Sequence, residues 1–370
     1  MINSLTSLRF IFAMMVFGAH CYIIDDFFDA HFFKEGFVGV NFFFVLSGFI
    51  IAYTYQENLL NRKLDKRTFW VARMARVYPL HWLTLFIAIV VGDGIVTSGA
   101  LDWCQHFFAS FILVNAYVPR VDYFFSFNSP SWSLCCEQLF YVLFPFLLPL
   151  ISKKVNYLFW LFCVMAVLML LGMYITPEAQ IKEYWYVNPV CRFPDFIIGM
   201  LLFQLYGKLK NRRITFVGGS MIEILSIVLF FCFYFYAVEV PKVYRYSCYY
   251  WLPVSMILLS FSLQKGIVSR VLSNRILIKG GEISYGFYLI HLLVLSFYVD
   301  WEKDTGIYIV RYISIPILFC IIVLLSWVSH YYFEKPMNRW IKKYLIHNQW
   351  NRLQSRILVS RLWMLYGALP

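Results

Sequence analysis

The sequence predicts an all-α integral membrane protein whose helices form one bundle and cross the bilayer about ten times. Of its 370 residues, 61% are hydrophobic and 14% are charged, whereas a soluble domain carries roughly 25% charged residues. The apolar residues fall in separate runs of about 20 residues, the length that a helix needs to cross ~30 Å of hydrocarbon. A helix also satisfies its own backbone hydrogen bonds inside lipid. These observations together favour a helical bundle.

Ten apolar runs have the length of a membrane span. They cover residues 5–24, 36–56, 77–97, 131–151, 155–175, 189–206, 216–238, 246–265, 283–300 and 307–333. An eleventh run, 103–118, is shorter, and we expect it to be re-entrant or to lie on the outer surface. The first run lacks a basic stretch before it and a small-residue cleavage site after it, so we expect a retained helix and not a signal peptide.

The distribution of Lys and Arg predicts the orientation, because these residues accumulate in cytoplasmic loops. With the N-terminus inside and 103–118 not spanning, 23 of the 32 Lys and Arg residues fall on the inner side and six on the outer side. This bias disappears if 103–118 spans. We therefore expect both termini in the cytoplasm. The net charge of +12 is then explained by topology and by contacts with membrane lipids, and no nucleic-acid partner is expected.

The chain shows no Gly/Ser linker, attached soluble domain or clear internal repeat, so we expect residues 1–337 to form one membrane domain. Residues 338–370 mix basic side chains with Trp340, Leu345 and Trp350, which is typical of an amphipathic helix at a membrane surface. We predict a basic amphipathic cytoplasmic tail. The nine Cys show no CxxC pair and no Cys/His metal spacing, so neither a disulfide framework nor a metal site is predicted.

The first predicted helix contains two ionisable residues, Arg9 and His20. Such groups are costly inside a membrane and each is a candidate for function. They are 11 residues apart, which at 100° per residue places them on one helix face, about 16 Å apart along the axis. The alternative is that Arg9 extends to the inner headgroups and His20 is a hydrogen-bond partner within the bundle.

The 131–151 run begins at Ser131, which Trp132 and Ser133 follow. Glu137 lies about a turn and a half inside this run. A carboxylate at that depth needs a partner, and His20 is predicted to lie at a similar depth. We therefore expect Glu137 to contact His20. Trp132 is equally compatible with an interfacial aromatic belt.

Two arginines, Arg73 and Arg76, stand where the basic loop 57–76 meets the next helix. Residues three apart share one helix face, and a pair of guanidinium groups suits a phosphate at a membrane surface. Anchoring of the helix is the alternative role. In the preceding helix, Ser47 and Gly48 favour close helix packing.

The other polar residues inside predicted spans are weaker candidates. Arg192 and Asp195 are three apart, and the simplest interpretation is that they neutralise each other. His291 follows Ser284 and Tyr285 in another apolar run. A single intramembrane His is more often a packing hydrogen-bond partner than a catalyst.

Together, and in this order, these motifs resemble acyltransferase family 3, the membrane O-acyltransferases that act on O-antigen, exopolysaccharide and related glycans. The resemblance runs from residue 5 to about residue 340. Its pieces are Arg9-x10-His20, Gly39-Val40 with Phe43 to Phe49, Arg73-x-x-Arg76-x-Tyr78-Pro79, Trp132-Ser133-Leu134 with Glu137 and Phe140-Tyr141, Ser284-Tyr285 with Tyr288 to His291, and Phe333-Glu334-Lys335-Pro336. Two departures are Asn41, where an acidic residue is common, and Cys135-Cys136 in place of small residues.

The resemblance implies transfer of an acyl group, usually acetyl, from cytoplasmic acyl-CoA to a hydroxyl of an extracytoplasmic or lipid-linked glycan, in the bacterial cytoplasmic (inner) membrane. Acyl-CoA (acetyl-CoA) would be a co-substrate, with no cofactor bound permanently. In this scheme His20, poised by Glu137, is the general base, and Arg9, Arg73 and Arg76 bind the donor. Candidate contacts to the pore or the acceptor are Ser47, Trp132, Ser133, Arg192, Tyr285 and His291.

Two other functions are compatible with the same residues. In a transporter or flippase for a lipid-linked or small polar substrate, Arg9, His20 and Glu137 would form a proton relay. The absence of a clear internal repeat weakens a transporter built from inverted halves. A non-catalytic membrane sensor is the third alternative.

Overall fold

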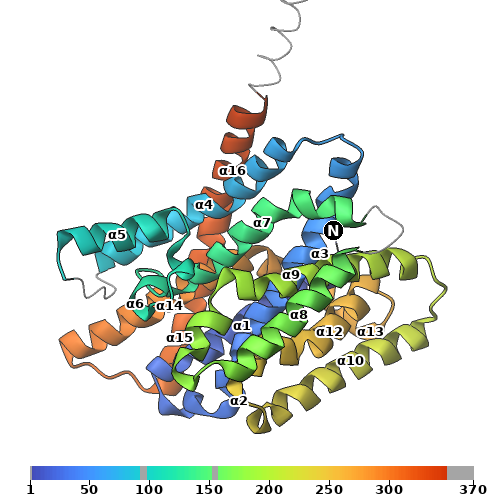
Figure 1. Cartoon of the computed structure of the whole chain (residues 1–370). Coiled ribbons are helices and arrows are strands. Elements are labelled where there is room, and N and C mark those ends of the chain that lie inside the picture. Colours follow the sequence, from blue (N-terminus) through green and yellow to red (C-terminus); the bar gives the residue numbers. More distant parts are fainter. Residues whose placement is uncertain (1, 92–97, 152–156, 348–370) are drawn as a thin grey trace, which may run out of the picture.

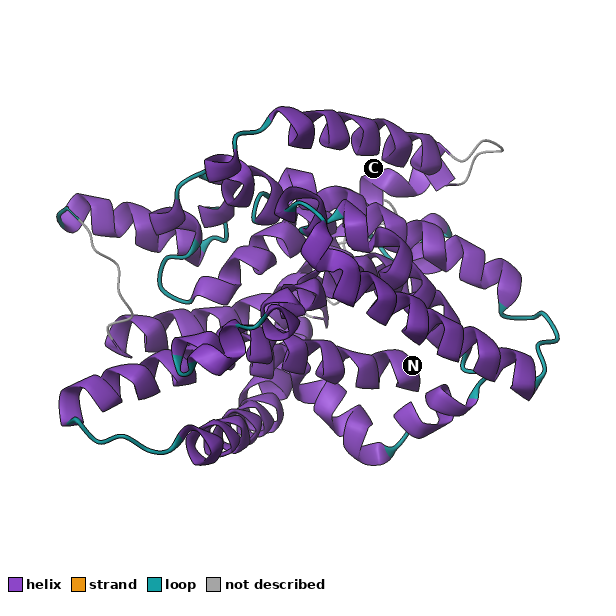
Figure 2. Ribbon diagram, turned by 90° about the horizontal axis from the view of Figure 1, so that it is seen from below, coloured by secondary structure: helices purple, strands orange, loops and turns teal. Residues whose placement is uncertain are grey.

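The computed structural model describes residues 2–91, 98–151 and 157–347, and within these ranges every regular element is a helix (Figure 1 and Figure 2). Nine of the helices described are long and apolar enough to cross a membrane. The expected all-α membrane bundle is therefore confirmed.

The long helices correspond to nine of the ten predicted spans. They are α1 (Asn3–His20), α3 (Val38–Leu60), α4 (Lys66–Val91), α7 (Trp132–Ile151), α8 (Tyr157–Ile175), α9 (Pro189–Leu209), α10 (Phe216–Tyr236), α14 (Arg275–Thr305) and α15 (Arg311–Val328). The shorter helices are α2 (His31–Lys34), α5 (Ala100–Phe111), α6 (Val121–Phe124), α11 (Lys242–Arg245), α12 (Trp251–Leu263), α13 (Ile267–Leu272) and α16 (Lys335–Lys342).

The span predicted over 246–265 is shorter than expected. It is an apolar helix over Cys248–Leu263, which at 1.5 Å per residue rises about 24 Å. A full crossing needs about 30 Å. The helix ends because Gln264 adopts a left-handed conformation with φ 52°, and Gly266 then leads into α13.

The segment 103–118 contains no helix long enough to span. Its helix α5 has 12 residues, too few to cross the hydrocarbon. The segment is held against α4 by two side chains: His81 Nε2 donates to Ser110 O at 2.9 Å, and Trp82 Nε1 donates to Phe111 O at 3.0 Å. Whether it is re-entrant or lies on the outer surface stays a prediction.

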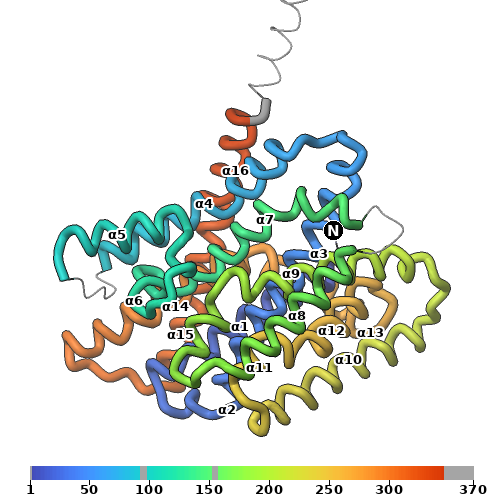
Figure 3. The backbone as a smooth tube through the Cα atoms, in the orientation of Figure 1, coloured from blue at the N-terminus to red at the C-terminus, as the bar shows by residue number. Residues whose placement is uncertain are grey.

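Two groups of segments meet at opposite ends of the bundle, whose backbone is traced in Figure 3. At one end, Ser4 Oγ donates to Phe261 O at 2.6 Å, so the start of α1 lies beside the end of α12. At the other end, Arg245 of α11 pairs with Glu35 just after α2. The predicted topology places the start of α1 and the end of α12 on one side of the membrane, and Glu35 and α11 on the other, in agreement with both contacts. Which end faces the cytoplasm remains the prediction made from charge.

Close packing of α3 and α9 forms the centre of the bundle. A Cβ atom built on Gly48 would lie 2.0 Å from Phe196 O, and one built on Gly199 would lie 2.0 Å from Val45 O. Small residues allow such close approach between membrane helices. The packing role expected for Gly48 is thus observed.

The last long helix extends further than predicted. From α15 it continues through a π turn, Ser329–Glu334, into α16, and the helical segment spans Arg311–Leu345. In Figure 1 α16 projects beyond the neighbouring helices. The predicted start of the tail at 338 falls inside this helix, and residues 348–370 of the predicted tail lie outside the described ranges.

Candidate active site

A cavity of about 410 Å³ opens between α1, α3, α4, α7 and α14. Its volume falls in the range of small-molecule sites, roughly 300–1,000 Å³. Three arginines line it, Arg9, Arg73 and Arg76, together with Ser47 and Glu137. We call it the arginine cavity. With Tyr285, which also lines it, the cavity collects from five helices residues that the sequence singled out separately.

The arginine cavity is positively charged. Three guanidinium groups line it against one carboxylate, that of Glu137. Arg73 donates from Nη2 to the Tyr141 hydroxyl at 2.9 Å, whereas Arg9 and Arg76 have no hydrogen-bond or ion-pair partner among the described residues. Enclosed charges are stable only when paired, and Arg binds phosphate through paired N–H groups. The cavity therefore suits a ligand that carries phosphate.

Tyr141 joins the acidic and basic sides of this cavity. Its hydroxyl donates to the Glu137 carboxylate and accepts from Arg73, and the Arg73 guanidinium lies 4.5 Å from the Tyr141 ring centroid. The sequence interpretation assigned Tyr141 no role. The sequence feature that indicates this role is the four-residue spacing between Glu137 and Tyr141, which places both side chains on one helix face.

A second, smaller cavity continues from the first. It has a volume of about 60 Å³, shares Arg9, Glu137 and Tyr285 with the arginine cavity, and adds Ser133 and Tyr288 to its wall. We call it the inner hollow. Tyr285 also ties α14 to α4 across the cavities, because its hydroxyl donates to Val77 O at 2.8 Å.

Beyond the inner hollow, His20 of α1 faces His291 of α14. His291 Nδ1 lies 2.7 Å from the carbonyl of Tyr288, a residue of the inner hollow. His20 Nδ1 lies 2.8 Å from Val16 O and 3.3 Å from His291 Nε2. The two histidines thus form one contact pair, which is joined to the wall of the hollow through Tyr288.

The hydrogen bonds assign the protons on both rings. A carbonyl oxygen only accepts, so Nδ1 of each ring carries the hydrogen. His20 Nδ1–H then donates to Val16 O and, in a shared bond, to the lone pair of His291 Nε2. Nε2 of His20 is left unprotonated and has no protein partner among the described residues. This is the arrangement that a general base requires.

The expected contact between Glu137 and His20 was wrong. Glu137 bonds to Tyr141 and lines the arginine cavity with Arg9, and the partner of His20 is His291. Both predicted depths were measured from the ends of apolar runs. Such depths do not give the direction in which a side chain leaves its helix.

Arg192 lies away from both cavities. It is fully buried, pairs with Asp195 at 2.9 Å and donates to Asn41 Oδ1 at 2.5 Å. Asp195 in turn accepts from Ser247 Oγ at 2.8 Å. Arg192 therefore belongs to a buried network that joins α3 and α9. This agrees with the interpretation that Arg192 and Asp195 neutralise each other.

Trp132 is also buried, and its ring lies 4.7 Å from that of Tyr186. It is the first residue of α7 and precedes Ser133 of the inner hollow. In the described ranges, no group of three or more His, Cys, Asp or Glu side chains is arranged to hold a metal ion.

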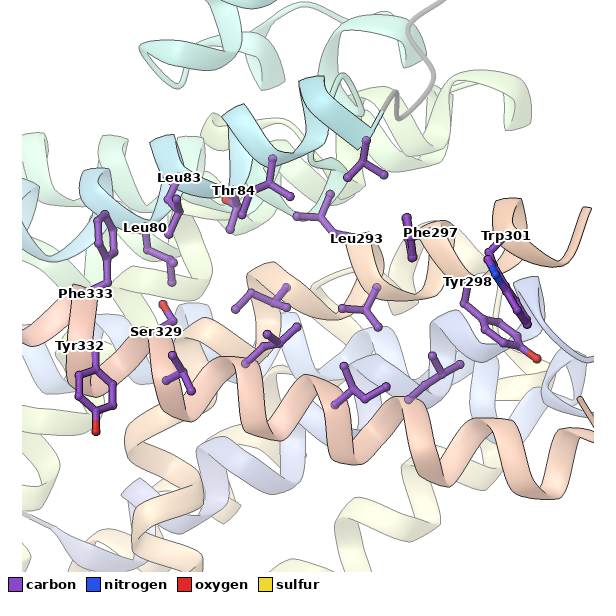
Figure 4. A pocket seen from close by; sticks show the side chains of 18 residues that line it. Leu80, Leu83, Thr84, Leu293, Phe297, Tyr298, Trp301, Ser329, Tyr332 and Phe333 are labelled. Atoms are coloured by element: carbon purple, nitrogen blue, oxygen red, sulfur yellow. The ribbon is translucent and has the colours of Figure 1, made fainter. Parts of the chain in front are cut away.

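The largest cavity described, about 680 Å³, is a different kind of space. It lies between α4, α14 and α15, and aliphatic and aromatic side chains such as Leu83, Leu293 and Phe297 line it (Figure 4). No charged residue contributes to its wall. It suits a hydrocarbon chain and offers no group for acid–base chemistry.

Comparison with known proteins agrees with this site. A family model for an acyltransferase domain matches residues 2–331. The chain is 28% identical over 323 residues to the acyltransferase MdmB of Streptomyces mycarofaciens, covering 80% of this chain and 79% of that protein. It is 27% identical over 288 residues to the peptidoglycan O-acetyltransferase OatA of Listeria monocytogenes, covering 71% of this chain and 45% of OatA. No solved structure matches. The chain belongs to acyltransferase family 3 and is an integral membrane O-acyltransferase.

Proposed function

We propose that this O-acyltransferase takes an acyl group, acetyl in the simplest case, from cytoplasmic acyl-CoA and transfers it to a hydroxyl of an extracytoplasmic or lipid-linked glycan. The bacterial inner membrane is the proposed location. One observation carries the proposal: the arginine cavity shares residues with the inner hollow, and Tyr288 in the wall of the hollow contacts His291, the partner of a histidine with a free basic nitrogen. The similarity to a peptidoglycan O-acetyltransferase supports a glycan acceptor.

The arginine cavity is the proposed donor site. CoA carries several phosphate charges, and Arg73 and Arg76 offer guanidinium groups that match phosphate geometry. The predicted orientation places these two residues on the cytoplasmic side, where acyl-CoA is found. The acyl-bearing arm would then extend past Arg9 and through the inner hollow toward His20.

The proposed transfer is a general-base reaction. Nε2 of His20 takes the proton of the acceptor hydroxyl while the hydroxyl oxygen attacks the thioester carbonyl. The carbon–sulfur bond breaks, and the CoA sulfur leaves with its electron pair and recovers the proton from His20. No oxidation state changes, so the reaction needs no redox cofactor.

His291 has a defined part in this scheme. When His20 Nε2 gains a proton, the ring becomes positively charged, and its Nδ1–H still donates to Val16 O and to His291 Nε2. Hydrogen bonds from a charged donor are stronger than neutral ones. His291 would therefore stabilise the imidazolium, which is the role that was expected of Glu137.

Glu137 is then assigned to the donor side. It balances part of the charge in the arginine cavity and, through Tyr141, fixes the position of Arg73. We propose that it orients the arginines toward the donor.

The decisive experiment uses the full-length protein in lipid nanodiscs, radiolabelled acetyl-CoA and a purified glycan acceptor. We expect label on the glycan in the wild type and none in His20→Ala at equal protein abundance. Movement of an unmodified substrate across vesicles, with no label transferred, would favour a transporter and would contradict the proposal.

A further inference from the structure

The wall of the inner hollow has a charged part and an apolar part. The charged part, Arg9 and Glu137, also lines the arginine cavity. Two serines belong to the hollow alone, and the hydroxyl groups of Ser133 and Ser284 each donate to the carbonyl three residues earlier, at 3.0 Å and 2.9 Å. The other residues that line only the hollow are Val40, Phe44, Leu134 and Tyr288. This part of the wall therefore presents mainly hydrocarbon.

Contacts behind the apolar part hold it in place. The ring of Phe44 meets two further rings edge to face, that of Trp132 at 6.0 Å and that of Phe140 at 5.4 Å. The hydroxyl of Tyr288 donates to Pro130 O at 3.3 Å, which fixes the far end of that side chain. A wall that is packed from behind cannot accept extra methylene groups without strain. The volume of the hollow is therefore a property of the fold.

That volume matches a very small group. The hollow measures about 60 Å³, which is about twice the ~30 Å³ that a water molecule occupies in the liquid. An acetyl group, with two carbons and one oxygen, is of this size, and each additional methylene needs nearly the volume of another water molecule. One extra methylene in a hydrophobic pocket changes kcat/KM by about 10- to 200-fold. A hollow of fixed size can therefore discriminate between acyl chains.

The large apolar cavity of Figure 4 does not adjoin the donor site. None of its 18 lining residues is shared with the arginine cavity or with the inner hollow. The inner hollow, in contrast, shares four residues with the arginine cavity: Arg9, Phe43, Glu137 and Tyr285. For a donor whose phosphates lie in the arginine cavity, the adjoining space is thus the small hollow.

We propose that the inner hollow is the acyl site and that its fixed volume selects acetyl over longer acyl chains. The methyl group would contact Val40, Phe44 and Leu134, which set the limit, and the thioester carbonyl would lie at the charged part of the wall. This inference rests on the proposed function, because it takes the arginine cavity as the site of CoA.

The first test measures donor binding without an acceptor. Full-length protein in nanodiscs binds radiolabelled acetyl-CoA, which is then displaced by unlabelled acetyl-CoA, propionyl-CoA or butyryl-CoA. We expect butyryl-CoA to require a concentration at least about tenfold higher than acetyl-CoA, with propionyl-CoA between them. Equal displacement by all three would overturn the proposal.

Enlarged variants test whether the named residues set the limit. Leu134→Ala should raise the ratio of kcat/KM for butyryl-CoA to that for acetyl-CoA about tenfold or more. The matched control is Leu148→Ala, because Leu148 is also buried in α7 and lines none of the four cavities described. A gain in the use of a longer donor cannot result from partial unfolding.

A second pair of variants repeats the test on another helix. Val40→Ala in α3 should raise the same ratio, and Val45→Ala is its control, because Val45 is buried in α3 and lines none of the four cavities. Unchanged ratios in both enlarged variants, or equal gains in the two controls, would overturn the proposal.

The outcomes separate this inference from the proposed function. Transfer of acetyl, propionyl and butyryl to the glycan with equal kcat/KM would reject the acyl site and leave the transferase function standing. If the wild type transfers nothing to any glycan, the proposed function fails, and the order of displacement by the three acyl-CoA donors still decides whether the hollow selects acetyl.

Discussion

Nδ1 of His20 lies 3.3 Å from Nε2 of His291, across the interface between α1 and α14. The carbonyl bonds of both rings make His20 the donor in this contact and leave its Nε2 free. The Val16 carbonyl therefore sets the tautomer of the proposed base, and His291, 271 positions away in the sequence, supplies the second acceptor.

We expect His291→Ala to reduce kcat by roughly ten- to a hundredfold, because the imidazolium loses a charge-assisted hydrogen bond worth about 1.5–3 kcal/mol. KM for acetyl-CoA should change little, since His291 does not line the arginine cavity. Steady-state kinetics with varied donor and acceptor test this. Equal kcat in the variant and the wild type, at matched abundance, would return His291 to a packing role.

The donor site predicts a different kinetic pattern. Arg73→Lys or Arg76→Lys should raise KM for acyl-CoA by about ten- to a hundredfold and change KM for the acceptor much less, because Lys does not reproduce the paired N–H groups of Arg. Tyr141→Phe should act in the same direction, since it removes the hydroxyl that joins Glu137 and Arg73. Lys preserves the positive charge that orients the helix, so topology should survive. An unchanged donor KM in all three variants would leave the arginines with an anchoring role.

The fold followed from the sequence because hydrocarbon thickness sets helix length. The exception, Cys248–Leu263, ends at Gln264, and its left-handed backbone leaves no trace in hydropathy. Within a helix, spacing was also sufficient: Arg192 and Asp195, three residues apart, do pair.

Contacts between helices could not be predicted in the same way. Glu137 and His20 belong to α7 and α1, and His291 belongs to α14. Which of these faces the other depends on the order of helices around the bundle. The apolar pattern of one sequence predicted nine of the ten spans but not that order.

Reporter fusions test the predicted orientation. Fusions after Lys154, Arg213 and Lys279 should all report the cytoplasm, because 23 of the 32 Lys and Arg residues fall on the inner side in this topology. Lys154 lies outside the described residues, so its fusion tests the charge argument alone. An external signal at any one of the three would require a different path for 103–118.

The crossing of α3 and α9 gives a prediction about stability. In Gly199→Ala the new methyl group would lie 2.0 Å from the backbone oxygen of Val45, and a backbone atom has no rotamer through which to move away. The helices must separate, at a cost of about 1–3 kcal/mol. Gly207→Ala, on the same helix, meets no atom within 4 Å and is the matched control. It is expected to be neutral or slightly stabilising because Ala favours helix.

We expect a lower Tm for Gly199→Ala in detergent. We also expect a raised KM for acyl-CoA, because Ser47 of the arginine cavity lies next to Gly48 at this crossing. Equal Tm values for the two variants would show that α3 and α9 separate at little cost.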